Sequence, residues 1–578
     1  GLGFGPDMVH AYRGATAIDG VCYYGADQFP EYYRNGFFLG EVVNSRVNFF
    51  TLKRDGGTYT AMQQADFITS SDGWFRPVDI KLGPDGAIYI ADFYNRIIGH
   101  YEVPLTHPGR DRTSGRIWRI VYRGTDGKAP PPQAPRQDWT KATVDELLQD
   151  LAHPNLTVRM LATHQWVERG LDAIAAKVAA LGRNSPPTVR AHALWILERL
   201  GVLDEAIVKA AAKDGELLVR VHLLRILAER PKLTKEESAI VQDALRRADD
   251  GLVRRVAAEA LGRHPDLDAR RELLDVLEEW KTAADPFLRH TLRIALREQF
   301  RGRNDWTVVR LPDRPSMTGI ALGQPGAEGI RSDIAETRDR DRDRDRPVLA
   351  DIAVGLPEPG ATHYLASVAD WLGKSQPTRL ADCAHHVARY AELDQPGQFV
   401  AFIRAANSSD AQDRGPAVLL ALLRGFQERG SPPPAQVTDC ARDQCSTLFS
   451  SHKPDDLRAA IELAAALRSR PMQANVLRIL IDRQKPEAVR VAALNGLAAF
   501  DPKELVDAVA RRLADAGETV TFREKVAQHL AGVNAPEARA ALLAALPTAP
   551  ARLASVIASG LAGTPEGATA LLDAIAAG

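Results

Sequence analysis

The sequence predicts a multidomain chain in which an all-β part, read as the last blades of a β-propeller, precedes an all-α HEAT-repeat superhelix of the ARM type. Of the 37 Phe, Trp and Tyr residues, 21 fall within residues 1–124, and aromatic residues favour strands. A Val-Arg phrase then recurs among Ala, Leu and Arg residues, which favour helices. A Pro-rich stretch between the two parts is typical of an extended linker.

Composition excludes several classes of protein. The 578 residues carry 73 Lys and Arg against 74 Asp and Glu, so the net charge of −1 excludes a strongly basic footprint for nucleic acid. Four cysteines exclude a disulfide-dense scaffold. No apolar run approaches the length of a membrane-spanning helix. Because the chain opens on Gly1 within a strand-like segment and ends in a helical one, we expect a fragment of a longer protein.

Residues 1–124 carry the strand signals. Short segments rich in aromatic and β-branched residues cover residues 36–40, 47–52, 77–82, 87–91 and 115–122. Gly83-Pro-Asp-Gly86 joins two of them and suits a tight hairpin turn. Since a blade takes about 40–45 residues, this part holds two or three blades, and the propeller is expected to begin upstream.

Residues 125–138 form the predicted linker, and residues 139–300 the first HEAT-repeat block. Each copy of the phrase is followed by apolar residues four and eight positions after its first residue, and in every copy but the first also seven positions after it, which places one apolar stripe on a helix face. Such a helix pair buries its stripe only against neighbouring repeats. The sequence from Thr143 fits a capping box, and Pro286 and Pro486 stand just before helical runs. The copies are Val158-Arg159, Val189-Arg190, Val219-Arg220, Val253-Arg254 and Leu288-Arg289.

Residues 301–349 interrupt the repeats. They contain an alternating Arg/Asp tract at 338–346, which indicates either a docking segment or a solvated linker. Residues 350–578 return to helical composition, with a clear repeat phrase at Val489-Arg490 and a degenerate one at Phe522-Arg523. They predict a second α-solenoid block.

Few residues have the spacing of a metal or catalytic site. Cys440 and Cys445 are interpreted as a local disulfide, half a metal site or two ordinary helix cysteines. Cys383 and His386 share a helix face and form a possible ligand pair, but no second pair is apparent, so no metal site is predicted. Lone histidines on the repeat helices, such as His153, His192, His222 and His264, are interpreted as packing or surface residues and not as ligands.

The segment Ser71–His100 carries the candidate binding residues. Arg76 precedes one predicted strand, and Asp92 and Asn95 follow the next. At the mouth of a propeller channel, an Arg and an Asp are suited to an anionic cofactor and a cation, respectively. The structural alternative is that Asp92 and Asn95 cap turns and that Arg76 makes an internal ion pair.

This segment, with Asp27–Gly40 before it and Arg110–Val121 after it, resembles the planctomycete/verrucomicrobial type of putative membrane-bound dehydrogenase. Members join a propeller similar to the PQQ-dependent glucose/sorbosone dehydrogenases to HEAT repeats and a haem-binding domain. The resemblance implies PQQ and Ca²⁺ as cofactors, with Arg76 contacting the quinone. Arg76 matches the second residue of an Arg pair in those enzymes, and Trp74 stands at the first position of that pair. No residue here matches the family's catalytic base, and haem c is expected only in a C-terminal domain that this chain lacks.

Two functions follow as expectations. The whole protein oxidises a sugar or other alcohol with a quinone, passes electrons to haem c and works in the periplasm or at the cell surface, while this fragment alone is inactive. Alternatively, the chain is a non-catalytic scaffold that uses its propeller and HEAT surface for a protein partner, a sugar or a polysaccharide. A nucleic-acid partner is not expected, because the repeat arginines occupy one fixed position and suit a ladder of ion pairs between repeats.

Overall fold

The computed structural model describes residues 17–99, 103–129, 131–132, 134–170, 185–279, 285–304, 306, 345–392, 395–405, 409–500, 502–533 and 535–577. The chain divides into two compact units, of which the first ends at Phe300 and the second continues from Arg301. No helix of the described residues is both long and apolar enough to cross a membrane.

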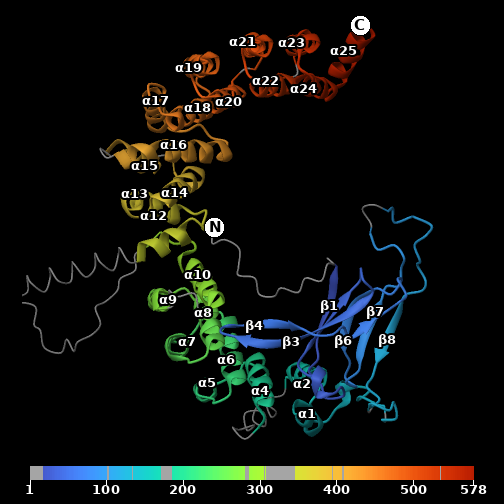
Figure 1. The fold of residues 1–578 in the computed structure, drawn as a ribbon. Coiled ribbons are helices and arrows are strands. Elements are labelled where there is room, and N and C mark those ends of the chain that lie inside the picture. The colour runs from blue at the N-terminus through green and yellow to red at the C-terminus, as the bar shows by residue number, and fades with distance from the viewer. Residues whose placement is uncertain are drawn as a thin grey trace, which may run out of the picture. The chain divides into compact units, whose positions relative to one another are not determined.

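The first unit begins with two antiparallel sheets (Figure 1). The larger sheet has the strand order β1-β2-β3-β4, with β5 paired to β3, and the smaller sheet has the order β6-β7-β8. A propeller is therefore not shown; the described β part consists of one five-stranded and one three-stranded sheet. The strands are β1 (Ile18–Tyr23), β2 (Phe37–Glu41), β3 (Arg46–Asp55), β4 (Thr58–Gln63), β5 (Ile68–Thr69), β6 (Pro77–Leu82), β7 (Ile88–Asp92) and β8 (Arg116–Ile120).

All five predicted strand segments are confirmed, as β2, β3, β6, β7 and β8. The predicted turn is also present, with Gly86 at φ +78° and its N–H donating to the Gly83 carbonyl at 3.0 Å. The sheets pack through β1 and β2 against β6. A Cβ on Gly40 would lie 2.1 Å from the Pro77 carbonyl oxygen, so this approach requires a residue without a side chain.

The hairpin β3–β4 connects the larger sheet to the helices of the same unit. At its tip the Gly57 N–H donates to the Asp285 carboxylate at 2.6 Å, and Arg255 Nη1 donates to the Gly57 carbonyl at 3.1 Å. Arg54 forms an ion pair with Asp250 nearby. The Pro-rich segment thus links two parts that pack together in one unit.

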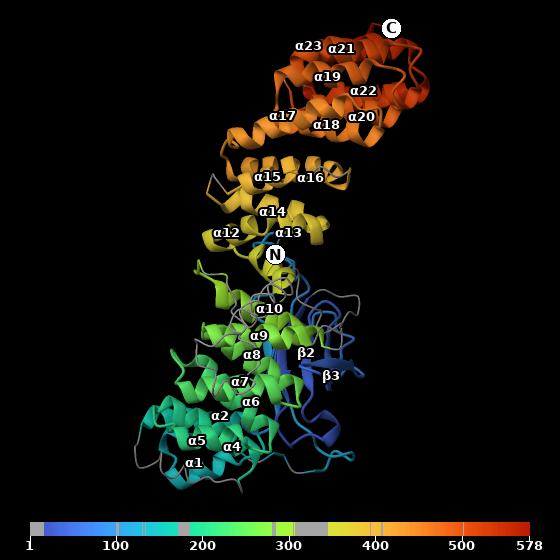
Figure 2. The same cartoon turned by 90° about the vertical axis from the view of Figure 1, so that its left-hand side faces the viewer.

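Helices of the first unit form two layers (Figures 1 and 2). Helices α2, α4, α6, α8 and α10 make the inner layer beside the sheets, while α5, α7 and α9 lie outside them. The bounds are α1 (Val144–Leu151), α2 (Leu156–Arg169), α4 (Pro187–Arg199), α5 (Glu205–Ala212), α6 (Leu217–Glu229), α7 (Lys235–Arg247), α8 (Gly251–Arg263), α9 (Leu267–Glu279) and α10 (Pro286–Phe300).

The repeat phrase marks this inner layer. Every copy in residues 139–300 lies near the start of an inner helix, and the predicted apolar stripe is buried. In α6, for example, Leu223, Ile226 and Leu227 are at most 1% exposed. The capping box at Thr143 is present in full, and α10 begins at Pro286. The HEAT-like helical repeat predicted from the sequence is therefore confirmed as an architecture.

The second unit continues as paired helices, and the views of Figures 1 and 2 agree that α18, α20, α22 and α24 form one layer of it. Both of its repeat phrases lie in this layer, on α20 and α22. The bounds are α12 (Pro359–Ser367), α13 (Ala369–Ser375), α14 (Pro377–Tyr390), α15 (Gly397–Ala405), α16 (Ser409–Arg429), α17 (Ala435–Phe449), α18 (Pro454–Leu467), α19 (Arg470–Ile481), α20 (Glu487–Leu497), α21 (Pro502–Ala514), α22 (Val520–Gly532), α23 (Pro536–Ala545), α24 (Ala551–Ala562) and α25 (Pro565–Ala576). The Arg/Asp tract lies outside the described residues except for positions 345–346.

Candidate functional site

Arg76, the predicted cofactor ligand, is buried at 8% exposure between the two sheets and directs its guanidinium to the main chain. Its Nε donates to the Asn95 carbonyl at 2.9 Å. Its Nη1 donates to the carbonyls of Val42 and Val43 at 2.6 and 3.2 Å, and to Ser45 Oγ at 3.4 Å. Burial lowers the pKa of Arg76, although the nearby Asp92 opposes this effect. Arg76 thereby ties the loop after β2 to the loop after β7.

Asp92 is also buried and satisfied by the chain itself. Its Oδ1 accepts hydrogen bonds from the backbone N–H groups of Arg76 at 2.8 Å and Tyr94 at 2.9 Å. Its Oδ2 accepts one from Trp118 Nε1 at 3.0 Å. Both carboxylate oxygens therefore organise the loop and the neighbouring strand β8.

Asn95 completes the same network. Its Nδ2 donates to the Asp111 carbonyl at 2.6 Å, and its Oδ1 accepts from the Ile97 N–H at 3.2 Å. The structure thus brings Arg76, Asp92 and Asn95 together. Asp92 and Asn95 organise turns, as the structural alternative describes, whereas the Arg76 guanidinium bonds to main-chain carbonyls and not, among the described residues, to a carboxylate. These donors and acceptors are used within the fold, and the cofactor role of the three residues stays a prediction.

The cysteine and histidine candidates are similarly occupied. All four cysteines are buried and free, and burial raises the pKa of Cys383 and Cys445 to about 12. His386 donates from Nε2 to the Leu356 carbonyl at 2.9 Å. Among the described residues, no group of three or more His, Cys, Asp or Glu side chains has the arrangement of a metal site.

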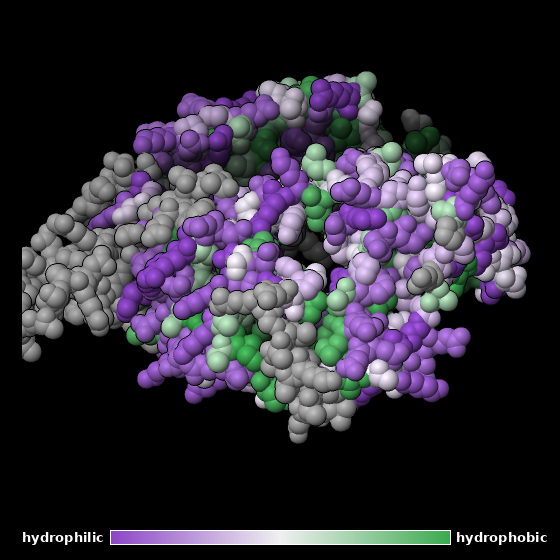
Figure 3. All heavy atoms as spheres, turned by 90° about the horizontal axis from the view of Figure 1, so that it is seen from below, coloured by the Kyte–Doolittle hydropathy of each residue, from purple (hydrophilic) through white to green (hydrophobic). Residues whose placement is uncertain are grey.

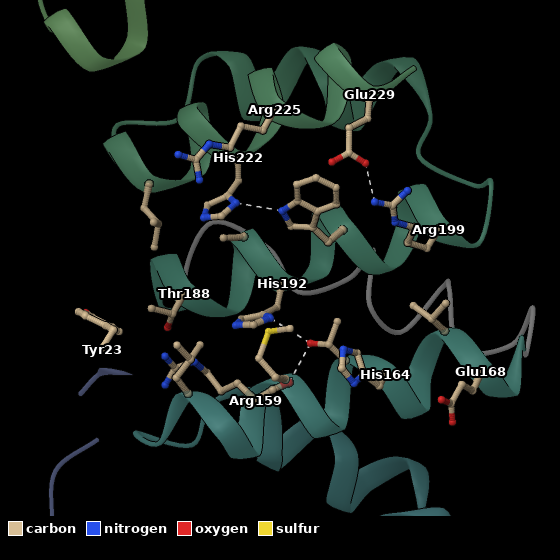
Figure 4. A pocket seen from close by; sticks show the side chains of 17 residues that line it. Tyr23, Arg159, His164, Glu168, Thr188, His192, Arg199, His222, Arg225 and Glu229 are labelled. Atoms are coloured by element: carbon tan, nitrogen blue, oxygen red, sulfur yellow. Dashed lines mark hydrogen bonds and ion pairs between the residues drawn. The ribbon is translucent and has the colours of Figure 1, made fainter. Parts of the chain in front are cut away.

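A larger candidate lies on the inner helices of the first unit, and we call it the α2–α6 groove (Figure 4). It has a volume of about 830 Å³, within the range of ligand sites. It is lined by Tyr23 of β1, by the apolar residues Leu156, Met160, Val167, Ala191, Trp195 and Leu218, and by the polar residues Arg159, Thr163, His164, Glu168, Thr188, His192, Arg199, His222, Arg225 and Glu229.

Two neutral histidines stand at the centre of the α2–α6 groove. Trp195 Nε1 donates to His222 Nδ1 at 2.9 Å, and His192 Nδ1 lies 2.9 Å from Thr163 Oγ1. Burial lowers the pKa of both histidines to about 4, with further lowering by Arg159 at His192 and by Arg225 at His222. Each ring is thus uncharged at neutral pH and fixed by the preceding inner helix.

The charges of the α2–α6 groove are unevenly placed. Arg199 pairs with Glu229 at one end, where Glu168 also lies, and Arg159 and Arg225 lie toward the Tyr23 end (Figure 4). Arg159 Nη1 donates to the carbonyls of His153 and Pro154 at 2.7 and 2.8 Å. In the described part of the chain, neither Arg159 nor Arg225 has a carboxylate partner.

Sequence reasoning interpreted His192 and His222 only as packing or surface residues. A signal was nevertheless present, because both stand two positions after the repeat arginine in consecutive copies. On the face drawn in Figure 3, hydrophilic residues cover most of the surface and hydrophobic residues form separate patches.

Comparisons with known proteins give one family match. Residues 6–124 match the model of a domain of unknown function, DUF7133, which covers about a fifth of the chain. No curated protein sequence matches the chain.

Among solved structures, the chain is similar to a Kap121p mutant with a TM-score of 0.43 and 13% identity, covering 75% of this chain and 49% of that one. It is similar to Kap121p bound to Pho4p with a TM-score of 0.42 and 12% identity, covering 75% and 50%. The chain spans about half the length of these structures. Likeness at this level carries no information on function, and the match to the DUF7133 model is confined to residues 6–124.

Proposed function

We propose that this chain is a binding scaffold that holds a segment of a partner protein in the α2–α6 groove. The observation that supports this function is the groove itself, with apolar walls and polar side chains that converge on its centre. Inner helices of a solenoid form a continuous surface, which suits an elongated ligand.

The groove is fixed in place before any ligand arrives. The N-terminus of α2 is fastened to the sheets, because Asn155 Nδ2 donates to the Gly83 carbonyl at 2.8 Å and Thr157 Oγ1 donates to the Leu82 carbonyl at 2.9 Å. The Leu156 N–H donates to the Gly25 carbonyl at 2.7 Å. A site held by rigid elements loses less entropy on binding, which favours affinity.

Peptide selection tests this function. A phage-displayed library of random linear peptides is panned on the wild-type chain after depletion on Met160→Trp, which fills the groove with a bulky uncharged side chain from a partly exposed position. We expect enriched peptides to bind the wild-type chain and to lose roughly tenfold or more in affinity, over 1.4 kcal/mol, for the variant.

Leu267→Trp is the matched control, because Leu267 is a similarly exposed apolar residue at the start of α9, outside the groove. It should leave binding unchanged. Enrichment of no peptide, or of peptides that bind Met160→Trp as well as the wild-type chain, would contradict the proposed function.

The quinone-dependent oxidation implied by the sequence resemblance is kept as a second candidate function, together with its location in the periplasm or at the cell surface. What supports it is the ordered set of motifs around Arg76 on consecutive antiparallel sheets. Equilibrium dialysis of PQQ against the chain, with and without Ca²⁺, tests it. Saturable binding that Arg76→Lys weakens would favour this function, and no binding would count against a cofactor site in these residues.

A further inference from the structure

We infer that the ligand of the α2–α6 groove is an extended acidic peptide, whose backbone bonds to His192 and His222 and whose carboxylate lies at the Tyr23 end beside Arg159 and Arg225. This inference rests on the proposed function and adds the chemistry of the partner. It depends on two hydrogen-bond assignments and on the charge distribution of the groove.

His222 offers a hydrogen-bond donor. The indole N–H of Trp195 can only donate, so His222 Nδ1, at 2.9 Å, accepts with its lone pair. Since burial keeps the ring neutral with a pKa of about 4, its single proton is on Nε2. That Nε2–H has no partner among the described residues, and in Figure 4 it points away from Trp195.

His192 offers an acceptor. The Thr163 hydroxyl has one hydrogen and donates it to the Arg159 carbonyl at 2.8 Å. It must therefore accept from His192 Nδ1, which leaves the lone pair of the neutral ring on Nε2. The two histidines, at the same position of consecutive repeats, present opposite hydrogen-bonding character.

A peptide backbone has the complementary groups. Its carbonyl suits the donor of His222, and its N–H suits the acceptor of His192. Neighbouring packed helices lie about 8–10 Å apart, and an extended chain rises about 3.3 Å per residue. A segment crossing from α4 to α6 therefore places an N–H and a carbonyl about three residues apart at the two rings.

The charges select an acidic segment. Arg225 is exposed and without an ion pair in the described structure, and Arg159 Nε is buried with no hydrogen-bond acceptor. Toward the other end Arg199 and Glu229 neutralise each other. A carboxylate at the Tyr23 end would gain charge-assisted hydrogen bonds, whereas a Lys or Arg side chain there would meet two like charges.

Matched synthetic peptides test this inference by fluorescence anisotropy. The probe is fluorescein-labelled Gly-Asp-Leu-Glu-Phe-Asp-Leu-Gly, compared with versions in which Asn and Gln, or Lys, replace its acidic residues, and with one N-methylated along its backbone. We expect the acidic probe to bind tightest, the Lys version at least tenfold more weakly, and the N-methylated version also at least tenfold more weakly.

Arg225→Glu is the decisive variant, because Arg225 is exposed and its change leaves the helix packing intact. It should weaken the acidic probe at least tenfold, and Arg263→Glu, an exposed arginine on α8 outside the groove, should not. Equal affinity of the acidic, neutral and Lys probes, or an unchanged affinity for Arg225→Glu, would overturn the inference.

The panning result separates the two claims. Selected peptides that occupy the groove but are basic or neutral would overturn the acidic-peptide inference while the scaffold function stands. Selected peptides rich in Asp and Glu that lose affinity for Arg225→Glu support both. If no peptide is selected and no probe binds, both the function and the inference fail.

Discussion

Arg159 in the first unit and Arg490 in the second occupy the same position of the repeat, yet their surroundings differ. Arg490 is buried, donates from Nη1 and Nη2 to Glu518 at 2.8 and 2.6 Å, and lies over the Phe522 ring. Arg159 bonds only to carbonyls of its own loop. A repeat arginine therefore stabilises the packing of helices where the following repeat supplies a carboxylate. Where the following repeat supplies no carboxylate, the arginine is available for a ligand.

Loss of the ion pair between Arg490 and Glu518 should lower the stability of the chain more than the other substitutions do. Arg490→Ala leaves Glu518 buried without its main partner, which costs about 3–5 kcal/mol. Hydrogen exchange of the α20 and α22 amides measures this loss. Arg458→Ala, in an exposed pair on α18, should cost under about 1 kcal/mol, and equal effects of the two would contradict the distinction.

Arg76 is a third kind of arginine in this chain, because it is buried and its guanidinium bonds to carbonyls. Arg76→Ala leaves several of these carbonyls without a donor, and we expect a loss of about 2–4 kcal/mol in the free energy of unfolding. Urea unfolding followed by tryptophan fluorescence measures it. Lys81→Ala, on the exposed face of β6, is the control, and a similarly small effect of both changes would show that Arg76 does not hold the loops together.

The stability of the first unit is expected to depend on pH through the two buried histidines of the α2–α6 groove. Because the folded-state pKa of His192 and His222 is about 4 against an ordinary 6.5, the unfolded chain binds more protons between these values. Stability is therefore unaffected above pH 6.5 and falls as the pH drops toward 4, by about 1–3 kcal/mol for each histidine.

Hydrogen exchange of the α4 and α6 amides at pH 6.5 and pH 4.5 measures this loss. His192→Gln/His222→Gln should lose less stability over the same interval, since glutamine does not titrate. An identical pH dependence in the wild-type chain and the double variant would mean that other groups control the acid response.

The smallest effect on stability is expected at the groove arginine itself. Arg225→Ala removes an exposed side chain with no ion pair in the described structure, so the free energy of unfolding should change by less than about 0.5 kcal/mol. Thermal unfolding measures it. A loss of stability comparable to that of Arg490→Ala would show that Arg225 stabilises the fold. Arg225 would then not differ from Arg490, and its proposed binding role depends on that difference.

The sequence predicted the repeats well because a stripe of apolar residues at helical spacing has one stable solution, burial against the next repeat. Two ion pairs of the predicted ladder are present, between Arg190 and Asp214 and between Arg490 and Glu518, whereas Arg159 and Arg523 bond to main-chain carbonyls. Strand β1 was missed because its Asp19-Gly20 pair is typical of a turn, and β4 because its composition is mixed.

The candidate site was harder to predict from sequence. Whether Arg76 faces a ligand or the main chain depends on the carbonyls that the loops after β2 and β7 direct at it, and no local pattern encodes them. Likewise, the hydrogen-bonding character of His192 depends on Thr163, which lies one repeat earlier. The recurrence of His in consecutive repeats is visible in the sequence, but the hydrogen-bonding role of each ring follows only from its partners in the structure.

The contact between the β3–β4 hairpin and α10 has a consequence for synthesis of the chain. Gly57 and Asp285 are separated by 228 positions, so a ribosome adding about 5–20 residues per second needs roughly 10–50 seconds between them. During that interval the hairpin tip has emerged, while the helices that cover it have not been made. The hairpin tip must therefore stay in solution without its helical partners for that interval, with the β4 edge open to other unpaired strands.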